Sequence, residues 1–429
     1  MASDQARSDR RRVANIMGGS AGNLVEWFDW YAYSVLTIYF APVLLPGHDR
    51  TTELLSAALI FAVGFLMRPI GAWAMGIYSD RHGRKSGLTL SVGLMAGGSL
   101  MIAAAPTYAA AGWLAPAVLL VARLIQGLSV GGEYGASATY LSEMALKDRR
   151  AFWASFQYMT LIGGQLLALG VVVVLQSTMS EASLQAWGWR VAFGVGAVLA
   201  LFVYWLRRRL VETQSFTKLK HDRPNSSLIK LWRDHPREFL IVVAISAGGS
   251  IAFYAYTTYM QKFLVNTSGF SRPDATRLMT LALIVFMAVQ PLWGLVADRF
   301  GRKPMLLIFG FGGMATSVPV FTALSHATSL TAAFGLVLVL LLILGSYTAI
   351  SGLIKAELFP AHIRTLGVAL PYAIGNSLFG GTAEYAALWF KQAGVESAFY
   401  WYLTAVIGMA TIGFLMMPEG KNTSLITER

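Results

Sequence analysis

Apolar segments long enough to cross a lipid bilayer recur along the whole chain. A membrane-spanning helix needs about 20 mostly apolar residues. The sequence predicts twelve such spans, at approximately 15–45, 53–79, 86–106, 113–141, 151–178, 190–209, 238–266, 275–297, 304–324, 330–357, 365–390 and 397–417. The two-residue alternation that is typical of membrane β-barrels does not occur. The pattern therefore predicts an all-α integral membrane protein with twelve transmembrane helices.

The amino-acid composition points to the same class of protein. Of the 429 residues, 55% are hydrophobic and only 13% are charged, with a mean hydropathy of +0.55, whereas a soluble protein carries about 25% charged residues. Cysteine is absent, which excludes disulfides and thiolate metal sites. The six histidines all lie outside the predicted spans, so no catalytic constellation forms in the core. We therefore expect no enzyme, no metal and no cofactor.

The distribution of basic residues predicts how the spans are oriented. The net charge is +12, and most Lys and Arg residues lie near the N-terminus, in alternate loops and in 207–237. Because basic loops face the cytoplasm, both termini are predicted to be cytoplasmic, and the positive charge does not indicate nucleic-acid binding. The segment 207–237 is too short to be a catalytic domain. We interpret it as a cytoplasmic linker between an N-terminal six-helix half, 1–206, and a C-terminal six-helix half, 238–429.

Two loops repeat one motif. The sequences GIYSDRHGRK at 76–85 and GLVADRFGRK at 294–303 both fit G-x-x-x-D-R-x-G-R-K and lie 218 residues apart. A Glu and an Arg seven positions apart also recur, at 143–150 and 357–364, 214 residues apart. A repeat at this distance predicts two pseudo-symmetric, duplicated halves with a shared site between them.

The repeated loop residues are interpreted as a gate. An Asp in each loop is able to cap a helix N-terminus and to pair with Arg, which would hold the halves together on the cytoplasmic side. The alternative, that Lys and Arg here only follow the charge rule for loops, does not account for the repeated Asp and Gly. The predicted gate residues are Gly76, Asp80, Arg81, Gly83, Arg84, Glu143, Arg150, Gly294, Asp298, Arg299, Gly301, Arg302, Glu357 and Arg364.

These loops resemble the signature of the major facilitator superfamily. GNLVEWFDWYAY (22–33), GFLMRPIG (64–71) and ARLIQGLSVGGEYG (122–135) resemble its metabolite:proton symporter branch. Narrower segments are similar to the 2-oxoglutarate carriers of that branch, namely ASFQYMTLIGGQLLAL (154–169), TYMQKFLVNTSG (258–269), ISGLIKAELFPAHIRTLGV (350–368) and FGGTAEYAAL (379–388). The resemblance covers about 11–417. It implies the major facilitator fold, alternating access, and a place in a bacterial cytoplasmic membrane.

Two arginines within the predicted spans are candidate substrate ligands. A charged side chain near mid-membrane costs about 2.5–3.5 kcal/mol, so each one needs a reason. Cations at this depth suit a substrate with carboxylates, and Arg68 and Arg123 lie there. The alternative for both is a structural ion pair with Glu26, Asp29 or Glu133.

Lys355 is the third candidate ligand. It lies in 350–368, one of the segments that resemble the 2-oxoglutarate carriers rather than the branch as a whole. A point charge of this kind is able to bind a carboxylate; the alternative is a pair with Glu384. Glu26 and Asp29 lie three residues apart on one helix face. Two carboxylates so close in a low dielectric are not easily ionised together, which suits a proton carrier. Glu384 is the remaining candidate for proton coupling.

Uncharged polar residues within the spans complete the predicted site. Hydroxyl and amide groups are able to hydrogen-bond a ketoacid, which makes Tyr254, Tyr256, Gln165 and Asn376 candidate substrate ligands. For the tyrosines, the alternative is an anchoring role at the membrane interface.

The resemblance and the buried charges together predict a secondary active transporter. Its predicted function is proton-coupled uptake of 2-oxoglutarate or a related dicarboxylate; the alternative is proton symport of another metabolite, such as citrate, proline/betaine or shikimate. The sequence has no phosphate-binding loop of an ATP-driven pump, and two unequal halves do not build a symmetric channel filter. The expected partners are the dicarboxylate, protons and the lipid bilayer, without nucleic acid, and we expect a monomer.

Overall fold

The computed structural model describes residues 2–45, 50–218 and 226–426. The side chains of 2–14, and residues 219–225 of the predicted linker, lie outside the described part, as do His48 and His221. Throughout the described residues the secondary structure is helical. The first six long segments are α1 (Ala2–Leu44), α2 (Arg50–His82), α3 (Arg84–Ala103), α5 (Leu114–Met144), α7 (Phe156–Thr178) and α9 (Trp189–Arg207).

Three of the last six long segments are interrupted. The seventh runs from α12 (Pro236–Phe253) through the short π-helix η4 (Tyr254–Tyr259) into α13 (Met260–Asn266). The eighth, ninth and twelfth are α14 (Arg272–Phe300), α15 (Arg302–Ser325) and α20 (Glu396–Met416). The tenth consists of α16 (Leu330–Thr348) and α17 (Ser351–Ala356). The eleventh consists of α18 (Arg364–Gly375), the π-helix η5 (Asn376–Gly380) and α19 (Ala383–Gln392).

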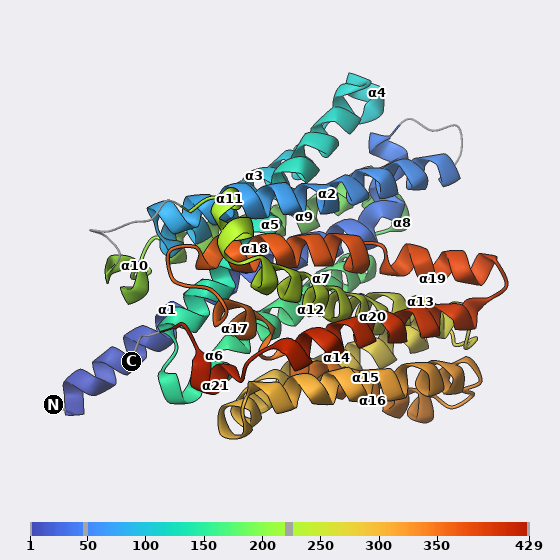
Figure 1. Cartoon of the computed structure of the whole chain (residues 1–429). Helices are drawn as coiled ribbons and strands as arrows, with labels where there is room; N and C mark the ends of the chain where they lie inside the picture. Colours follow the sequence, from blue (N-terminus) through green and yellow to red (C-terminus); the bar gives the residue numbers. More distant parts are fainter. Residues whose placement is uncertain (1, 46–49, 219–225, 427–429) are drawn as a thin grey trace.

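Short helices lie in the loops. They are α4 (Tyr108–Ala111), η1 (Lys147–Arg149), α6 (Arg150–Ala154), α8 (Glu181–Ser183), η2 (Leu184–Gly188), α10 (Gln214–Lys218), α11 (Leu228–Asp234) and α21 (Gly420–Thr423). The start of α1 and the last helix α21 lie at the same end of the bundle (Figure 1), as an even number of crossings requires. We call this end the basic face and define it by the loops at 80–85, 145–150, 298–303 and 357–364.

The predicted twelve-helix membrane fold is confirmed. Ten helical segments of the described residues are long and apolar enough to cross a membrane, and α1 and the eleventh segment complete the twelve. The eleventh predicted span, 365–390, corresponds to α18, η5 and α19, with a turn at 381–382 between the last two. The aromatic and acidic residues of α1 lower its hydropathy.

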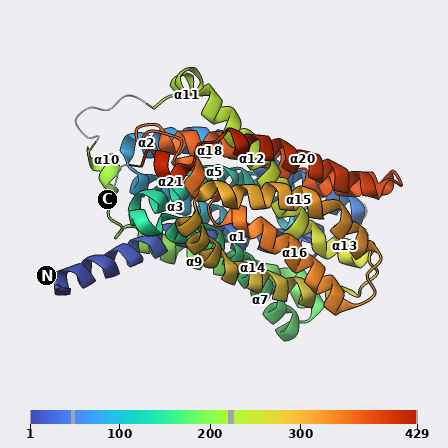
Figure 2. The ribbon, with the colours of Figure 1, turned by 60° about the horizontal axis from the view of Figure 1, so that its bottom comes forward.

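The long helices form one bundle in which both sets of six segments meet (Figures 1 and 2). In the first set, α2, α3 and α5 pack together and α1 packs on α7; in the last set, α20 packs on α12 and α15. The main contacts between the sets are made by α2 and α5, which lie on α18, by α5 on α17, and by α14, which lies on α6 and α7. These crossing helices carry the two repeated loops, so the fold brings the predicted gate to the boundary between the sets.

Candidate functional site

Asp80 at the end of α2 joins the two sets of segments on the basic face. Its carboxylate oxygens accept hydrogen bonds from the backbone N–H groups of Thr365 and Leu366, both at 3.1 Å. These residues form the first turn of α18, so the carboxylate caps that helix and interacts favourably with its dipole. The Ser226 hydroxyl donates to the same carboxylate at 3.1 Å, and the guanidinium of Arg84 lies 3.4 Å from it.

Asp298 makes the same connection in the second repeat. Its two carboxylate oxygens accept hydrogen bonds from the N–H groups of Ala151 and Phe152, both at 2.9 Å. These residues lie in the first turns of α6, which leads into α7. Arg302 lies 3.7 Å from the carboxylate. Each loop Asp therefore caps a helix of the opposite set.

Ion pairs extend both caps. Glu143 pairs with Arg364 of the last set and lies 3.4 Å from Arg84. In the second repeat, Glu357 lies 3.6 Å from Arg302 and interacts electrostatically with Arg150. All six side chains belong to residues that are buried. The repeated Glu and Arg are thus assembled beside the two caps, as their spacing predicted.

The glycines of the motif permit this geometry. A Cβ at Gly76 would lie 2.9 Å from the backbone of α18, and a Cβ at Gly294 would lie 2.8 Å from the backbone of α6. Gly83 and Gly301 have φ angles of +111° and +101°, a conformation that L side chains rarely adopt. The first glycine of each repeat therefore allows helices to cross closely, and the second allows the turn.

Arg81 and Arg299, the remaining motif residues, are exposed. Arg81 donates to the Ser226 carbonyl at 3.2 Å, so it contacts the segment that precedes α11. The guanidinium carbon of Arg299 lies 5.4 Å from the centre of the Phe300 ring. Both arginines thus lie at the exposed edge of the predicted gate, on the basic face.

Two further acids support the motif loops, and the sequence analysis missed both. Glu212 accepts hydrogen bonds from the first two N–H groups of α3, at 3.1 and 3.2 Å. Glu419 accepts from the first two N–H groups of α15, at 2.8 and 2.9 Å. Burial raises the pKa of Glu212. Burial has the same tendency at Glu419, but the N–H donors outweigh it and hold the pKa of Glu419 below its usual range.

A signal for these two acids was present in the sequence. Glu212 follows α9, the last span of the first set, and Glu419 follows α20, the last span of the second set. The two acids lie 207 residues apart. This separation differs from the 218 and 214 residues of the recognised repeats, so a search at fixed spacing does not find it.

A small cavity lies where α1, α2, α5, α7 and α18 meet. Its volume is about 20 Å³, close to what one water molecule needs. On the side of the cavity away from the gate, the Tyr31 and Thr258 hydroxyls lie 3.1 Å apart and the Ser377 hydroxyl donates to the Phe65 carbonyl at 3.0 Å. Contacts thus close the bundle on both sides. The cavity is lined by Asn23, Glu26, Trp27, Arg68, Val130, Gly131, Tyr134, Leu161, Tyr372 and Ala373.

The two candidate arginines lie beside the ring of Trp30. Arg68, which lines the cavity, donates to the Tyr254 hydroxyl at 3.3 Å, and its guanidinium carbon is 4.3 Å from the centre of the Trp30 ring. The guanidinium carbon of Arg123 is 4.2 Å from the same centre, and Arg123 donates to the side-chain oxygen of Gln126 at 2.8 Å. Both arginines are buried, and cation–π contacts stabilise them in place.

The buried acids of α1 accept hydrogen bonds from neutral groups. Glu26 accepts from the Ser129 hydroxyl at 3.5 Å. Asp29 accepts from the Ser99 hydroxyl and, at 3.2 Å, from the amide of Gln126. Because Gln126 also accepts from Arg123, it connects that guanidinium to the Asp29 carboxylate. Although Glu26 and Asp29 are only three residues apart on α1, they therefore accept hydrogen bonds from different side chains.

Glu133 has a partner that the sequence analysis did not identify. Arg207 donates to both carboxylate oxygens of Glu133, one at 2.8 Å and the other closer, and to the Leu88 carbonyl at 2.6 Å. Arg207 was predicted to be the first residue of the linker 207–237, whereas it is the buried last residue of α9. Among the described residues, Arg68 and Arg123 have no carboxylate within 4.0 Å, so the alternative ion pairs for them are not formed.

Lys355 is on α17, and tyrosine side chains from other helices surround its ammonium. Its ammonium donates to the Tyr134 hydroxyl at 2.8 Å and to the Ser351 hydroxyl at 2.7 Å. It is 4.9 Å from the centre of the Tyr134 ring and 4.6 Å from that of Tyr372. These two rings stack with their centres 3.4 Å apart, and both line the cavity. Lys355 therefore lies directly behind the cavity wall, and the sequence analysis missed both tyrosines that hold it there.

Glu384 does not contact Lys355. It pairs with Lys262, and the side chains of Glu384 and Lys262 are 33% and 49% exposed. The pair lies at the face opposite the gate, on α19 and α13. The alternative interpretation of a Lys355–Glu384 ion pair is therefore wrong, because α17 and α19 lie towards opposite ends of the bundle (Figure 1).

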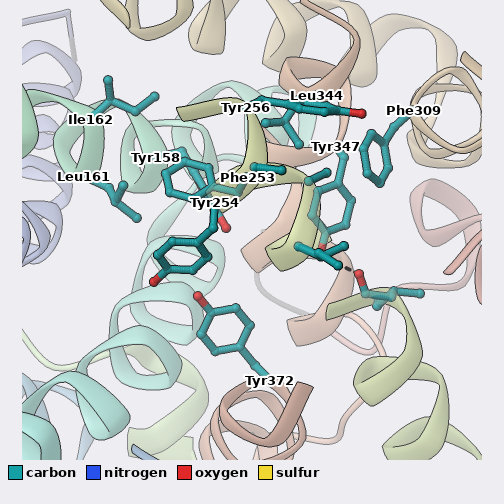
Figure 3. Close-up of a cluster of buried hydrophobic side chains, with 14 of the residues drawn as sticks. Tyr158, Leu161, Ile162, Phe253, Tyr254, Tyr256, Phe309, Leu344, Tyr347 and Tyr372 are labelled. Carbon is teal, nitrogen blue, oxygen red and sulfur yellow. Dashed lines mark hydrogen bonds between the residues drawn. The ribbon is translucent and has the colours of Figure 1, made fainter. Parts of the chain in front are cut away.

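The two candidate tyrosines of η4 point in different directions. Tyr254 and Tyr372 extend their hydroxyls into the same space, whereas Tyr256 lies apart from them (Figure 3). The Tyr256 hydroxyl lies 2.8 Å from that of Ser317 on α15. Side chains two residues apart on a helix do not face the same side, so the structure brings only Tyr254 to the cavity region.

Gln165 and Asn376 are buried with unused hydrogen-bonding groups. Neither amide atom of Gln165 has a partner among the described residues, and the same is true of the Asn376 amide nitrogen. Asn376, together with Tyr254 and Tyr372, lines a second small space next to the cavity. Buried polar groups normally have partners, so the Asn376 amide nitrogen is available to a polar ligand in this space. Gln165 is not among the residues that line the cavity or this second space.

Comparison with known proteins identifies the family. The sequence profile of the Major Facilitator Superfamily matches residues 21–377. The chain is 54% identical to the alpha-ketoglutarate permease of Escherichia coli, covering 97% of this chain and 96% of that protein. It is 31% identical to the citrate-proton symporter of Klebsiella pneumoniae, covering 86% and 83%.

The fold agrees with a solved transporter. The proton:xylose symporter XylE bound to 6-bromo-6-deoxy-D-glucose matches with a TM-score of 0.81 at 19% identity, covering 98% of each chain. Family and relatives confirm the prediction of a multi-pass membrane transporter rather than an enzyme. The chain therefore belongs to the Major Facilitator Superfamily.

Proposed function

We propose that this chain takes up 2-oxoglutarate or a related dicarboxylate together with protons. The observation that carries this proposal is the set of three buried cations, Arg68, Arg123 and Lys355, none of which has a carboxylate within 4.0 Å among the described residues. Buried charges are normally paired. A dianionic substrate would supply the missing negative charge, and the name of the Escherichia coli relative supports this substrate class.

The arrangement of the cations suggests how the substrate is held. Arg68 faces the cavity and offers a fork that matches a carboxylate. Lys355 is separated from the cavity only by Tyr134 and Tyr372, so a second carboxylate would take the place of the Tyr134 hydroxyl at the ammonium. The hydroxyl of Tyr254 and the amide nitrogen of Asn376 are then available to the keto group. Gln165 stays a candidate ligand because neither of its amide atoms has a partner among the described residues. Because the cavity has a volume of only about 20 Å³, substrate entry has to separate the two sets of segments.

Protons are proposed to travel on the acids of α1. Glu26 lines the cavity with Arg68, so its charge is sensitive to the arrival of a substrate carboxylate. Asp29 is connected to Arg123 through Gln126. Glu384 remains a candidate carrier at the opposite face, where it pairs with Lys262 of the same half and its side chain is 33% exposed.

Alternating access is proposed to proceed between an N-terminal half, 1–206, and a C-terminal half, 238–429, joined by the linker 207–237. The Asp80 and Asp298 caps would close the basic face. We place this face and both termini in the cytoplasm of a bacterial cell, with the protein in the cytoplasmic membrane, because basic loops remain on that side. The proposed partners are the dicarboxylate and protons; we propose a monomer without nucleic acid.

A counterflow assay with the purified full chain in liposomes tests the substrate. Labelled 2-oxoglutarate is expected to accumulate in liposomes loaded with unlabelled 2-oxoglutarate, and more weakly in those loaded with succinate. Liposomes loaded with proline, citrate or shikimate are expected to resemble protein-free ones. Counterflow of labelled proline without counterflow of 2-oxoglutarate would instead support a compatible-solute carrier.

The number of coupled protons has an expected minimum. Moving one charge against a membrane potential costs about 2.3 kcal/mol per 100 mV, so a dianion needs compensation on entering an inside-negative cell. Two protons make the cycle electroneutral and a third makes the potential favourable. We therefore expect at least two protons per dianion. Charge movement recorded during uptake into proteoliposomes checks this expectation, and a net inward negative current would refute it.

A further inference from the structure

A groove runs along the outside of the bundle at the basic face, between α2, α3 and α9. Its volume is about 470 Å³. Lys85 and Arg208 lie at its end nearest the loops, Thr89 and Tyr204 follow, and Gly93 and Leu94 lie furthest from the loops. It is separate from the central cavity, with which it shares no lining residue.

The order of residues along the groove gives it a gradient of polarity. Lys85, Thr89 and Gly93 are four residues apart and so share one face of α3, while Tyr204 and Arg208 share one face of α9. The groove thus changes from cationic to hydroxyl-bearing to apolar over nine residues, and a helix rises about 1.5 Å per residue. A phospholipid has the same order, with a phosphate, a glycerol ester region and an acyl chain.

The two cations of the groove have no acidic partner in the part of the chain that the structure describes. Among the described residues, no carboxylate lies within 4.0 Å of the Lys85 or Arg208 side-chain nitrogens. The neighbouring acid Glu212 is occupied by backbone N–H groups at the start of α3 and after α9. An anion is therefore free to approach both cations.

The second repeat does not offer this arrangement. Lys303 occupies the motif position that corresponds to Lys85, but its ammonium donates to the carbonyls of Leu415 and Met417 at 2.9 and 3.0 Å. These carbonyls at the end of α20 take the place that an anion would occupy. The difference between the two lysines arises from packing, since both motifs end in the same Gly-Arg-Lys sequence.

We propose that this groove binds an anionic phospholipid from the leaflet on the basic face. Its phosphate lies between Lys85 and Arg208, its ester region lies beside the hydroxyls of Thr89 and Tyr204, and an acyl chain follows α3 past Gly93. Basic residues near a membrane surface attract anionic lipid, and Leu90 on the rim is 38% exposed. The bound lipid contacts both the start of α3 and the end of α9. Glu212 already connects these two places, and Arg84 of the gate is the first residue of α3.

Native mass spectrometry of the full chain tests the proposal with phosphatidylglycerol and phosphatidylcholine as probes. We expect wild type to retain phosphatidylglycerol in preference to phosphatidylcholine. The double variant Lys85→Gln with Arg208→Gln is expected to bind phosphatidylglycerol roughly tenfold or more weakly, because two attractive charges are lost. The matched control, Arg299→Gln with Lys303→Gln, removes two charges from the same face and is expected to bind like wild type.

A second variant keeps both charges and fills the apolar end of the groove. A Cβ at Gly93 would meet only the Tyr204 ring, at 3.7 Å, so Gly93→Leu is compatible with folding and is expected to weaken lipid retention. An equal loss in both double variants, unchanged retention in Gly93→Leu, or displacement of the lipid by inorganic phosphate would overturn the proposal.

Discussion

Replacing Lys355 by Met is expected to weaken binding of 2-oxoglutarate by about ten- to over a hundredfold. A hydrogen bond to a charged group contributes roughly 1.5–3 kcal/mol, and about 1.4 kcal/mol corresponds to a factor of ten. The Lys355 ammonium already has two hydroxyl acceptors and three tyrosine rings around it, but no carboxylate of the described residues lies within 4.0 Å. The loss is therefore expected in the Kd for substrate, measured by isothermal titration or scintillation proximity on purified protein.

Further variants separate a ligand from a structural lysine. Lys355→Arg is expected to rescue only in part, because the guanidinium is larger and planar. Because Glu384 pairs with Lys262, adding Glu384→Gln to Lys355→Met is not expected to restore binding. Lys262→Met, which removes a cation from the exposed rim, is the matched control and is expected to bind substrate nearly as wild type does. Tight binding in Lys355→Met, or its recovery in the double variant, would show that Lys355 is not a ligand.

Asp80→Asn is expected to lower uptake by about tenfold or more while the protein still inserts into the membrane. The amide keeps one oxygen acceptor, but its NH₂ group then faces an N–H donor of α18 and the guanidinium of Arg84. Loss of a charged acceptor costs roughly 1.5–3 kcal/mol for each such hydrogen bond. The state that is closed on the basic face loses this stabilisation, and turnover falls because the gate no longer closes reliably.

Asp298→Asn is the matched comparison for the gate. It removes the same pair of backbone hydrogen bonds, but Asp298 is less buried than Asp80, and no hydroxyl of the described residues donates to it as Ser226 does to Asp80. Uptake is therefore expected to fall, but less than in Asp80→Asn. Since the chain has no cysteine, a single Ser137→Cys in the buried interior of α5 reports opening by thiol labelling. Wild-type turnover and labelling in both Asn variants would contradict the gate.

The membrane class, the number of crossings and the repeated motif could be predicted from the sequence. Hydropathy is a local property: each span of about 20 apolar residues is required by the thickness of the bilayer, whatever surrounds it. The motif was equally accessible, because duplication preserves the spacing of Asp80, Gly83 and Arg84 in a second copy. The turns at 349–350 and 381–382, inside the tenth and eleventh spans, were not predicted, because each lies within an otherwise apolar stretch.

The partners of the buried charges were decided only by the tertiary structure. Side-chain partners come from helices that are distant in sequence, so spacing along the chain does not determine them. Glu133 pairs with Arg207 and Glu384 with Lys262, while Glu26 and Asp29 accept from neutral groups. Within the described part of the chain, Arg68, Arg123 and Lys355 therefore have no acid within 4.0 Å. The sequence by itself therefore determined which charges are buried in the membrane, whereas the packing of the twelve segments decided which of them remain free to bind an anion.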